Sequence, residues 1–170
     1  SDTNYYPTKI TADIYIGTSK VVDVSFTATY TADFAPRTVN ASVSVVPYSL
    51  SMSYSESGAT QKMDASLKNS GKIILAAGVT LTFPSATAKD TTPDYFEGYV
   101  QVEDIKMSGK ANLKTMTGIK NPKAADFNAN CSLTFTRVSD NAKIGDLKAF
   151  DETDAYGYTE IVPYIVFSDG

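Results

Sequence analysis

Apolar and polar residues alternate along most of this chain. In the segment 10–16, isoleucine and alanine occupy every second position, and Thr, Asp and Tyr stand between them. The segment 22–30 repeats the pattern after the short link 17–20. A period of two is typical of a β-strand with one face turned toward a core, and so short a link between two such strands predicts a hairpin.

The same alternation continues to the end of the chain and predicts an all-β, antiparallel fold of about nine or ten strands. A single domain over residues 1–170 follows, with residues 1–7 as a flexible N-terminal tail. Links of hairpin length favour a barrel or a strongly curved sheet, and a two-sheet β-sandwich is the alternative. The further expected strands lie within residues 39–54, 63–67, 72–83, 95–107, 113–119, 127–135 and 159–167.

Four irregularities interrupt this pattern. Gly78 lies inside a long apolar run and predicts a bulge or corner. The phase of the alternation changes near Glu103 and Asp104, which predicts a second bulge unless the register is misread there. Apolar positions spaced by three predict at most one short helix within 141–150. The last strand, 159–167, is apolar at consecutive positions and is therefore expected to be covered on both faces.

Composition and charge narrow the class of partner. The net charge is −4 and the lysines are scattered, which argues against a nucleic-acid partner. No apolar run is long enough to predict a transmembrane helix. Cys131 is the single cysteine, and it lies in phase with apolar neighbours, so we expect a buried core residue rather than a reactive thiol.

The absence of histidine bears most directly on catalysis. Without histidine the chain cannot form a Ser-His-Asp or Cys-His arrangement, and most zinc sites are excluded as well. We therefore expect a non-enzymatic protein without a cofactor. A hydrolase that uses paired carboxylates is the enzymatic alternative, although nothing in the sequence places two carboxylates together.

Two groups of residues are candidates for binding. Clustered acids could supply oxygen ligands to calcium, and solvated loop acids are the ordinary alternative. Tyrosines in loops or near the N-terminus could line a ligand-binding rim, because a phenol combines a flat apolar face with a polar tip, and simple packing is the alternative. The acids are Asp146, Asp151, Glu152 and Asp154, and the tyrosines are Tyr5, Tyr6, Tyr156 and Tyr158.

The start Ser1-Asp2-Thr3, without an initiator methionine, suggests a trimmed exported protein. Together with the Ser/Thr-rich alternating strands of 41–54 and the all-β length, it resembles exported lipoproteins of Bacteroidetes with calycin-like or lipocalin-like domains. This resemblance implies a lipid anchor on a cysteine upstream of Ser1 and a barrel with one open mouth. It also implies an extracytoplasmic location in a bacterium: the periplasm, the outer membrane or the cell surface.

Three functions remain open at this point. The first is a non-enzymatic envelope domain that binds a small molecule, a glycan or a surface protein. The second is a structural or assembly module, such as a pilus, surface-layer or virion subunit. The β-prone run 72–79 and the doubly apolar last strand suggest it, because a neighbouring subunit could cover them. The third is the carboxylate hydrolase. An apolar pocket of roughly 300 Å³ or more would favour a small ligand.

Overall fold

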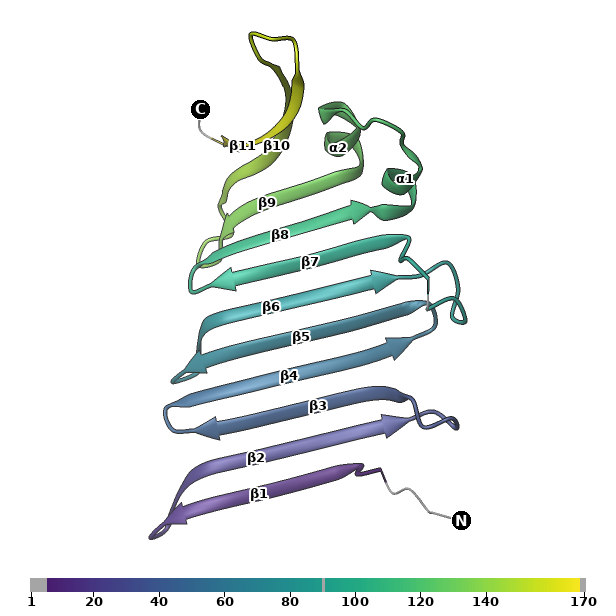
Figure 1. Ribbon diagram of the computed structural model, residues 1–170. Helices are drawn as coiled ribbons and strands as arrows, with labels where there is room; N and C mark the ends of the chain where they lie inside the picture. The colour runs from purple at the N-terminus through teal and green to yellow at the C-terminus, as the bar shows by residue number, and fades with distance from the viewer. Residues whose placement is uncertain (1–5, 90, 169–170) are drawn as a thin grey trace.

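The computed structural model describes residues 6–89 and 91–168 (Figure 1). Eleven antiparallel strands form one sheet, in which each strand pairs with the next one along the chain. Two short helices, α1 (Leu113–Gly118) and α2 (Ala124–Asn130), lie between the eighth and ninth strands. The strands are β1 (Lys9–Ile16), β2 (Ser19–Tyr30), β3 (Pro36–Val45), β4 (Tyr48–Ser57), β5 (Thr60–Asn69), β6 (Lys72–Thr82), β7 (Tyr95–Val102), β8 (Ile105–Asn112), β9 (Cys131–Arg137), β10 (Lys143–Thr153) and β11 (Thr159–Phe167).

The sheet is open, with β1 and β11 at its two ends (Figure 1). The all-β antiparallel class is confirmed. The expected barrel or strongly curved sheet is wrong, because closure requires the first and last strands to pair, and among the described residues β1 pairs with β2 alone and β11 with β10 alone. The chain also does not fold into the alternative sandwich, since all eleven strands belong to one layer.

The first hairpin is confirmed, and the two expected bulges are not. Ile10 pairs directly with Phe26 in β1 and β2. Gly78 keeps a regular register between β5 and β7, so there is no bulge at this position. Glu103 and Asp104 form the tight turn between β7 and β8, and Glu103 has a positive φ of 49°. The change of phase in the sequence marks this turn, so one predicted strand is in fact two.

The two helices occupy segments where strands were expected. Most of the expected strand 113–119 forms α1, which ends at Gly118, and the first half of the expected strand 127–135 belongs to α2. Each helix begins with a side chain that accepts a backbone N–H: Asn112 caps α1, and Asp126 accepts the N–H of Lys123 at the start of α2. At most one helix was expected, so the helix count is also wrong.

Helix α2 packs beside β10, where that strand extends beyond its shorter neighbour β9. Asn128 donates to the carbonyl of Ala149 and accepts its N–H, at 2.8 and 2.9 Å. A side-chain amide thus satisfies backbone groups that a longer β9 would have paired. The helix expected within 141–150 is wrong, because most of this segment forms β10, in which Leu147 and Phe150 lie on opposite faces.

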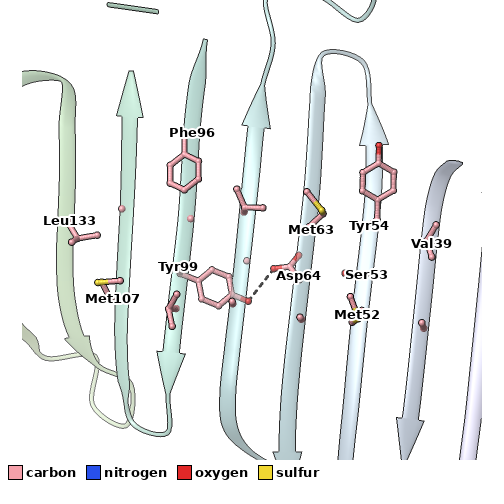
Figure 2. Close-up of a pocket in the computed structure, with 18 residues that line it drawn as sticks. Val39, Met52, Ser53, Tyr54, Met63, Asp64, Phe96, Tyr99, Met107 and Leu133 are labelled. Atoms are coloured by element: carbon pink, nitrogen blue, oxygen red, sulfur yellow. Dashed lines mark hydrogen bonds between the residues drawn. The ribbon is translucent and has the colours of Figure 1, made fainter. Parts of the chain in front are cut away.

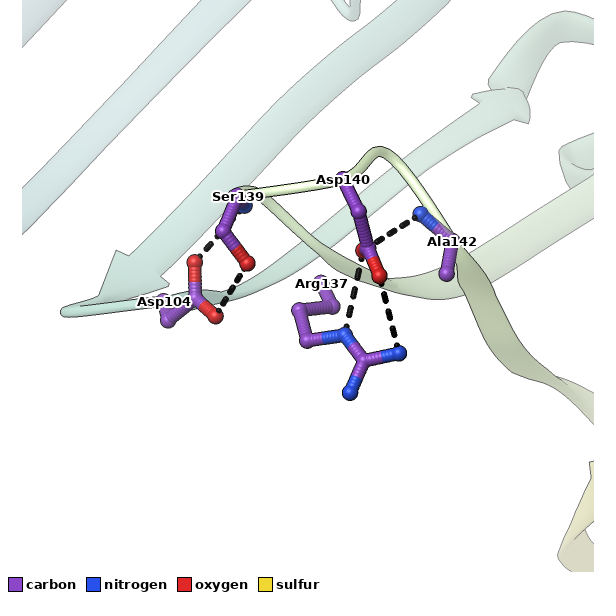
Figure 3. Close-up of polar contacts among 5 residues, drawn as sticks. All are labelled: Asp104, Arg137, Ser139, Asp140 and Ala142. Atoms are coloured by element: carbon purple, nitrogen blue, oxygen red, sulfur yellow. Dashed lines mark hydrogen bonds and ion pairs between the residues drawn. The ribbon is translucent and has the colours of Figure 1, made fainter.

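Polar contacts fix the turn between β9 and β10 against the turn between β7 and β8 (Figure 3). Asp104 accepts hydrogen bonds from the backbone N–H and the hydroxyl of Ser139, at 2.7 and 2.8 Å. Arg137 binds the carboxylate of Asp140 through two nitrogens, and Asp140 also accepts the N–H of Ala142. These contacts therefore hold together two turns that are far apart in the sequence and lie at the same end of their strands.

A single layer gives this protein almost no core. Among the described residues, the buried apolar side chains are Ala28, Ala76, Phe83 and Ala124, and no large side chain is fully buried. The accessible surface is 11780 Å². A globular protein of 18.3 kDa is expected to expose about 8,150 Å². The chain therefore exposes about 3,600 Å² more than a globular fold of its mass.

The last strand illustrates the same point. β11 begins and ends where the alternation predicted, at Thr159 and Phe167. It was expected to be covered on both faces, and this is wrong: β11 is an edge strand, and Tyr164, Ile165 and Val166 are each at least 43% exposed.

Candidate functional site

The two faces of the sheet differ in chemistry, most clearly across the central strands. Residues that pair directly across antiparallel strands lie on the same face, so the register assigns every strand residue to one face or the other. On one face, from Ile10–Ile14 in β1 to Pro163–Phe167 in β11, nearly every paired position is apolar or glycine. We call this the apolar face. The polar residues on this face lie near strand ends, and they include Glu56, Gln61, Asn69, Arg137 and Asp151. One row across its centre runs Ala41, Met52, Ala65, Ala77, Val100, Met107 and Phe135.

A recess lies at the middle of the apolar face, where two glycines meet. Gly98 of β7 pairs directly with Gly109 of β8, so two neighbouring strands carry no side chain there. The recess has a volume of about 550 Å³. Val79 and Leu133 flank the two glycines along the same row, and Met63 follows Val79. Further side chains of the lining are Met52, Tyr54, Phe96 and Met107 (Figure 2).

The side chains around the recess fit closely against the glycine backbone. A Cβ atom on Gly109 would lie 2.7 Å from Leu133 Cδ1 and 2.8 Å from the carbonyl oxygen of Ser132. A Cβ atom on Gly98 would lie 2.8 Å from the ring of Phe96. Gly109 therefore has no space for a side chain beside the backbone of β9, and a side chain at Gly98 would require the Phe96 ring to move. The result is an apolar depression on a face that is itself exposed, since Met52 is 57% and Val100 40% exposed.

The opposite face, which we call the polar face, consists mostly of Ser, Thr, Asn and Lys. Hydroxyls on neighbouring strands bond to one another, as in Thr29 with Thr38 at 2.7 Å and Ser51 with Ser66 at 2.9 Å. The side chains on this face therefore satisfy each other or face water, and the polar face needs no further cover.

Tyr99 is the one large aromatic residue near the centre of the polar face. Its ring crosses Gly78, and its hydroxyl donates to Asp64 at 3.2 Å (Figure 2). The ammonium of Lys106 lies 4.5 Å from the ring centroid, and that of Lys62 lies 3.1 Å from Asp64. Burial, followed by the hydrogen bond to Asp64, raises the pKa of Tyr99. Gly78 thus provides the space for a side chain that links three strands.

The four acids considered as calcium ligands each have a separate structural partner. Asp146 binds Lys143 at 2.6 Å, and this ion pair and the Thr134 hydroxyl lower its pKa. Asp151 accepts the N–H of Ala124 at the start of α2. Glu152 accepts the hydroxyl of Tyr164, and Asp154 accepts the backbone N–H groups of residues 156 and 158. Among the described residues, no three acids or cysteines gather as a metal site would require.

The candidate tyrosines are not brought together either. Tyr5 lies outside the described residues. Tyr6 stacks on Phe34 with ring centroids 5.1 Å apart and also contacts Tyr30. It therefore packs against the turn between β2 and β3. Tyr156 and Tyr158 lie at the tip of the β10–β11 hairpin, 87% and 73% exposed. The structure therefore places Tyr6 at one end of the sheet and Tyr156 and Tyr158 at the other.

Cys131 lies at the junction of α2 and β9, on the apolar face, and it is half-buried. Burial raises the pKa of its thiol. A raised pKa keeps the thiol protonated near neutral pH, which is the opposite of what a reactive cysteine requires.

Sequence reasoning found the residues of the apolar face but not the recess. The alternation identifies Met52, Met63 and Leu133 as members of one face. Gly98 and Gly109 become informative only when β7 and β8 are recognised as a hairpin that turns at residues 103–104, because the two glycines are then directly opposite. The tight turn was the signal that could have revealed them.

Comparison of the chain with protein-family models, with curated protein sequences and with solved structures gives no match. Neither described helix approaches the length and apolar character required to cross a membrane.

Proposed function

We propose that this protein is a non-enzymatic assembly module, whose apolar face is covered by another protein layer in its working state. The observation that carries this proposal is the exposed surface, about 3,600 Å² larger than that of a globular protein of equal mass. Monomeric proteins rarely expose apolar patches larger than a few hundred Å². An apolar face that extends over eleven strands is what a subunit interface requires.

The strict separation of the two faces supports the same proposal. A sheet with both faces in water would have polar residues on each, whereas here one face carries Ser and Thr and the other carries Val, Leu, Met and Phe. The alternation is typical of a sheet that packs against a second layer. The chain supplies no second layer among its described residues, so another polypeptide would have to provide it.

The openness of the sheet can be measured directly with two spin labels. We would label Thr11→Cys in β1 and Glu160→Cys in β11, in a Cys131→Ser background diluted with unlabelled protein. Ten steps between strands, at about 4.8 Å each, predict a separation of about 50 Å, reduced somewhat by twist. The pair Thr11→Cys with Ser25→Cys is the control, because these positions are directly opposed in β1 and β2.

A separation of roughly 15 Å or less between β1 and β11 would contradict the proposal, since adjacent strands lie only about 4.8 Å apart. That result would mean that the sheet closes on itself and buries its own apolar face. A separation near 40–50 Å, on the order of ten interstrand steps, would support an open sheet that needs a partner layer.

The recess supports a second candidate function, the binding of a small apolar ligand. Its volume of about 550 Å³ lies within the range of ligand pockets, and its lining is almost entirely apolar. Such a ligand would cover only the centre of the apolar face. Leu50, Val102 and Ile105, which lie beyond the lining, would stay exposed, so this candidate explains less of the structure.

A further inference from the structure

We infer that the layer covering the apolar face is a second copy of this chain, packed face to face as a two-sheet sandwich. This inference rests on the proposed assembly role and names the partner. A stack of two such sheets, about 10 Å apart, is the standard arrangement of a β-sandwich. Here each sheet would come from a different subunit.

The area of the face fits a homodimer. Strands of about ten residues and ten interstrand steps give a face of roughly 1,500 Å². Two copies would bury about 3,000 Å² in total, within the range of about 2,000–5,000 Å² for obligate homodimers. A small molecule in the recess would bury only a fraction of this area.

The charge distribution also favours a copy of the same chain. In a two-fold interface each surface patch meets the identical patch of its partner, so a charged side chain near the axis would meet its own kind. Between Val39–Val45 of β3 and Cys131–Phe135 of β9, the apolar face carries no charged residue within the paired strand centres. The charges of the chain lie on the polar face, at strand ends and in loops, where they would stay in water.

The shape of the face provides further complementarity. The recess at Gly98 and Gly109 is hollow, whereas Met52 and Val102 are 57% and 55% exposed. Flexible side chains such as methionine fill irregular gaps well. Two opposed copies can therefore place projecting side chains of one sheet into the recess of the other.

A membrane surface is a weaker match for the same face. Protein surfaces that bind membranes usually surround apolar residues with Lys and Arg, which attract anionic lipids. This chain carries a net charge of −4, and its lysines lie mainly on the polar face. The observations therefore favour a protein layer over a lipid surface.

The experiment measures the molar mass of the purified full chain by light scattering over about a hundredfold range of concentration. The expected mass is twice 18.3 kDa. Met52→Lys places a charge on the apolar face and should reduce the mass to that of one chain. Ser53→Lys, one residue along β4 and on the polar face, is the matched control and should leave the dimer intact.

A second measurement is needed in case Met52→Lys does not fold. In a Cys131→Ser background, Met52→Cys should react with a thiol reagent at least about tenfold more slowly than Ser53→Cys, because only the first is covered in the dimer. Equal reactivity of the two cysteines would contradict the inference. Binding of the wild-type chain as a monomer to uncharged phosphatidylcholine vesicles would contradict it too, and would assign the face to lipid.

The outcomes separate this inference from the proposed function. A wild-type monomer whose spin labels on β1 and β11 are far apart would overturn the homodimer and leave the assembly role with a different protein partner. A wild-type monomer whose labels are close together would overturn both. A homodimer that Met52→Lys dissociates and Ser53→Lys does not would support both.

Discussion

The two faces of this sheet are built from the same strands, yet their side chains differ in the contacts that they make. On the polar face, pairs such as Ser51 and Ser66 bond to each other across neighbouring strands. On the apolar face, Met52 and Ala65 occupy the next paired positions, between Ala41 and Ala77 of the neighbouring strands, and Met52 is 57% exposed. On the polar face, hydroxyls of one chain hydrogen-bond to each other, whereas on the apolar face large side chains such as Met52 remain exposed. The difference shows that a sequence can specify a regular sheet without also specifying a hydrophobic core.

The largest expected effect comes from comparing adjacent residues of β9. Leu133→Ala removes a large side chain beside the recess, and in a covered face this should cost about 2–4 kcal/mol in the free energy of unfolding. Thr134→Ala, on the polar face, removes one hydroxyl that donates to Asp146 and should cost about 1 kcal/mol. Urea unfolding at one fixed protein concentration measures both. Equal costs would mean that the two faces are equally exposed.

The second comparison concerns glycines on opposite faces. A Cβ atom on Gly145 would lie 2.6 Å from the carbonyl oxygen of Val166, which belongs to the backbone of β11. Gly145→Ala should therefore cost about 2–3 kcal/mol, because a paired strand cannot move away. Gly78→Ala on the polar face would collide with side chains alone, the ring of Tyr99 and the carboxylate of Asp64, and should cost about 1 kcal/mol.

A double variant sharpens this second prediction. If the Tyr99 ring is the obstacle, Gly78→Ala should cost much less in a Tyr99→Ala background, and the two changes should not be additive. Thermal unfolding of the four proteins measures the coupling. Additive costs would show that Gly78 is required for a reason other than the space that Tyr99 occupies.

A third prediction tests the contact between the β7–β8 turn and the β9–β10 turn. Asp104→Ala removes both hydrogen bonds from Ser139 and should cost about 1–2 kcal/mol. Asp104→Asn keeps one acceptor oxygen and should cost less. Hydrogen exchange at the Ser139 amide should accelerate in both variants, and more strongly in the first. An unchanged exchange rate would mean that Asp104 does not order this turn.

The smallest expected effect is the pH dependence contributed by Tyr99. Burial and the bond to Asp64 raise its pKa in the folded state. Stability from a raised pKa is fully present below the unfolded value, about 10 for tyrosine, and is lost as the pH rises through the folded value. Tyr99→Phe should therefore flatten the loss of unfolding free energy above about pH 10. An identical alkaline profile in the two proteins would contradict this assignment.

The alternation predicted the membership of both faces well, because period-two spacing is a local property of each strand. Val39, Leu50 and Val100, for example, share a face as the spacing implies. What covers that face is not a local property. An expected barrel requires the chain to fold around its own apolar residues, whereas the spacing shows only that these residues share a face.

The helices and the recess were missed for a different reason. Helix α2 is short, and Phe127, Ala129 and Cys131 continue an alternation that suits a strand equally well. Its position depends on Asn128 reaching the backbone of β10, a contact more than twenty residues away in the sequence. The recess depends in the same way on the pairing of Gly98 with Gly109, which only the turn at residues 103–104 establishes.

The order of the strands has a consequence for how such a chain can arise and fold. Each strand contacts mainly its neighbours in sequence, so the sheet can grow by one hairpin at a time as the chain leaves the ribosome, without waiting for a distant segment. Stability should then depend mostly on adjacent pairs, as it does in repeat proteins. The number of strands becomes an adjustable length, which a duplicated or deleted hairpin could change without altering the rest of the sheet.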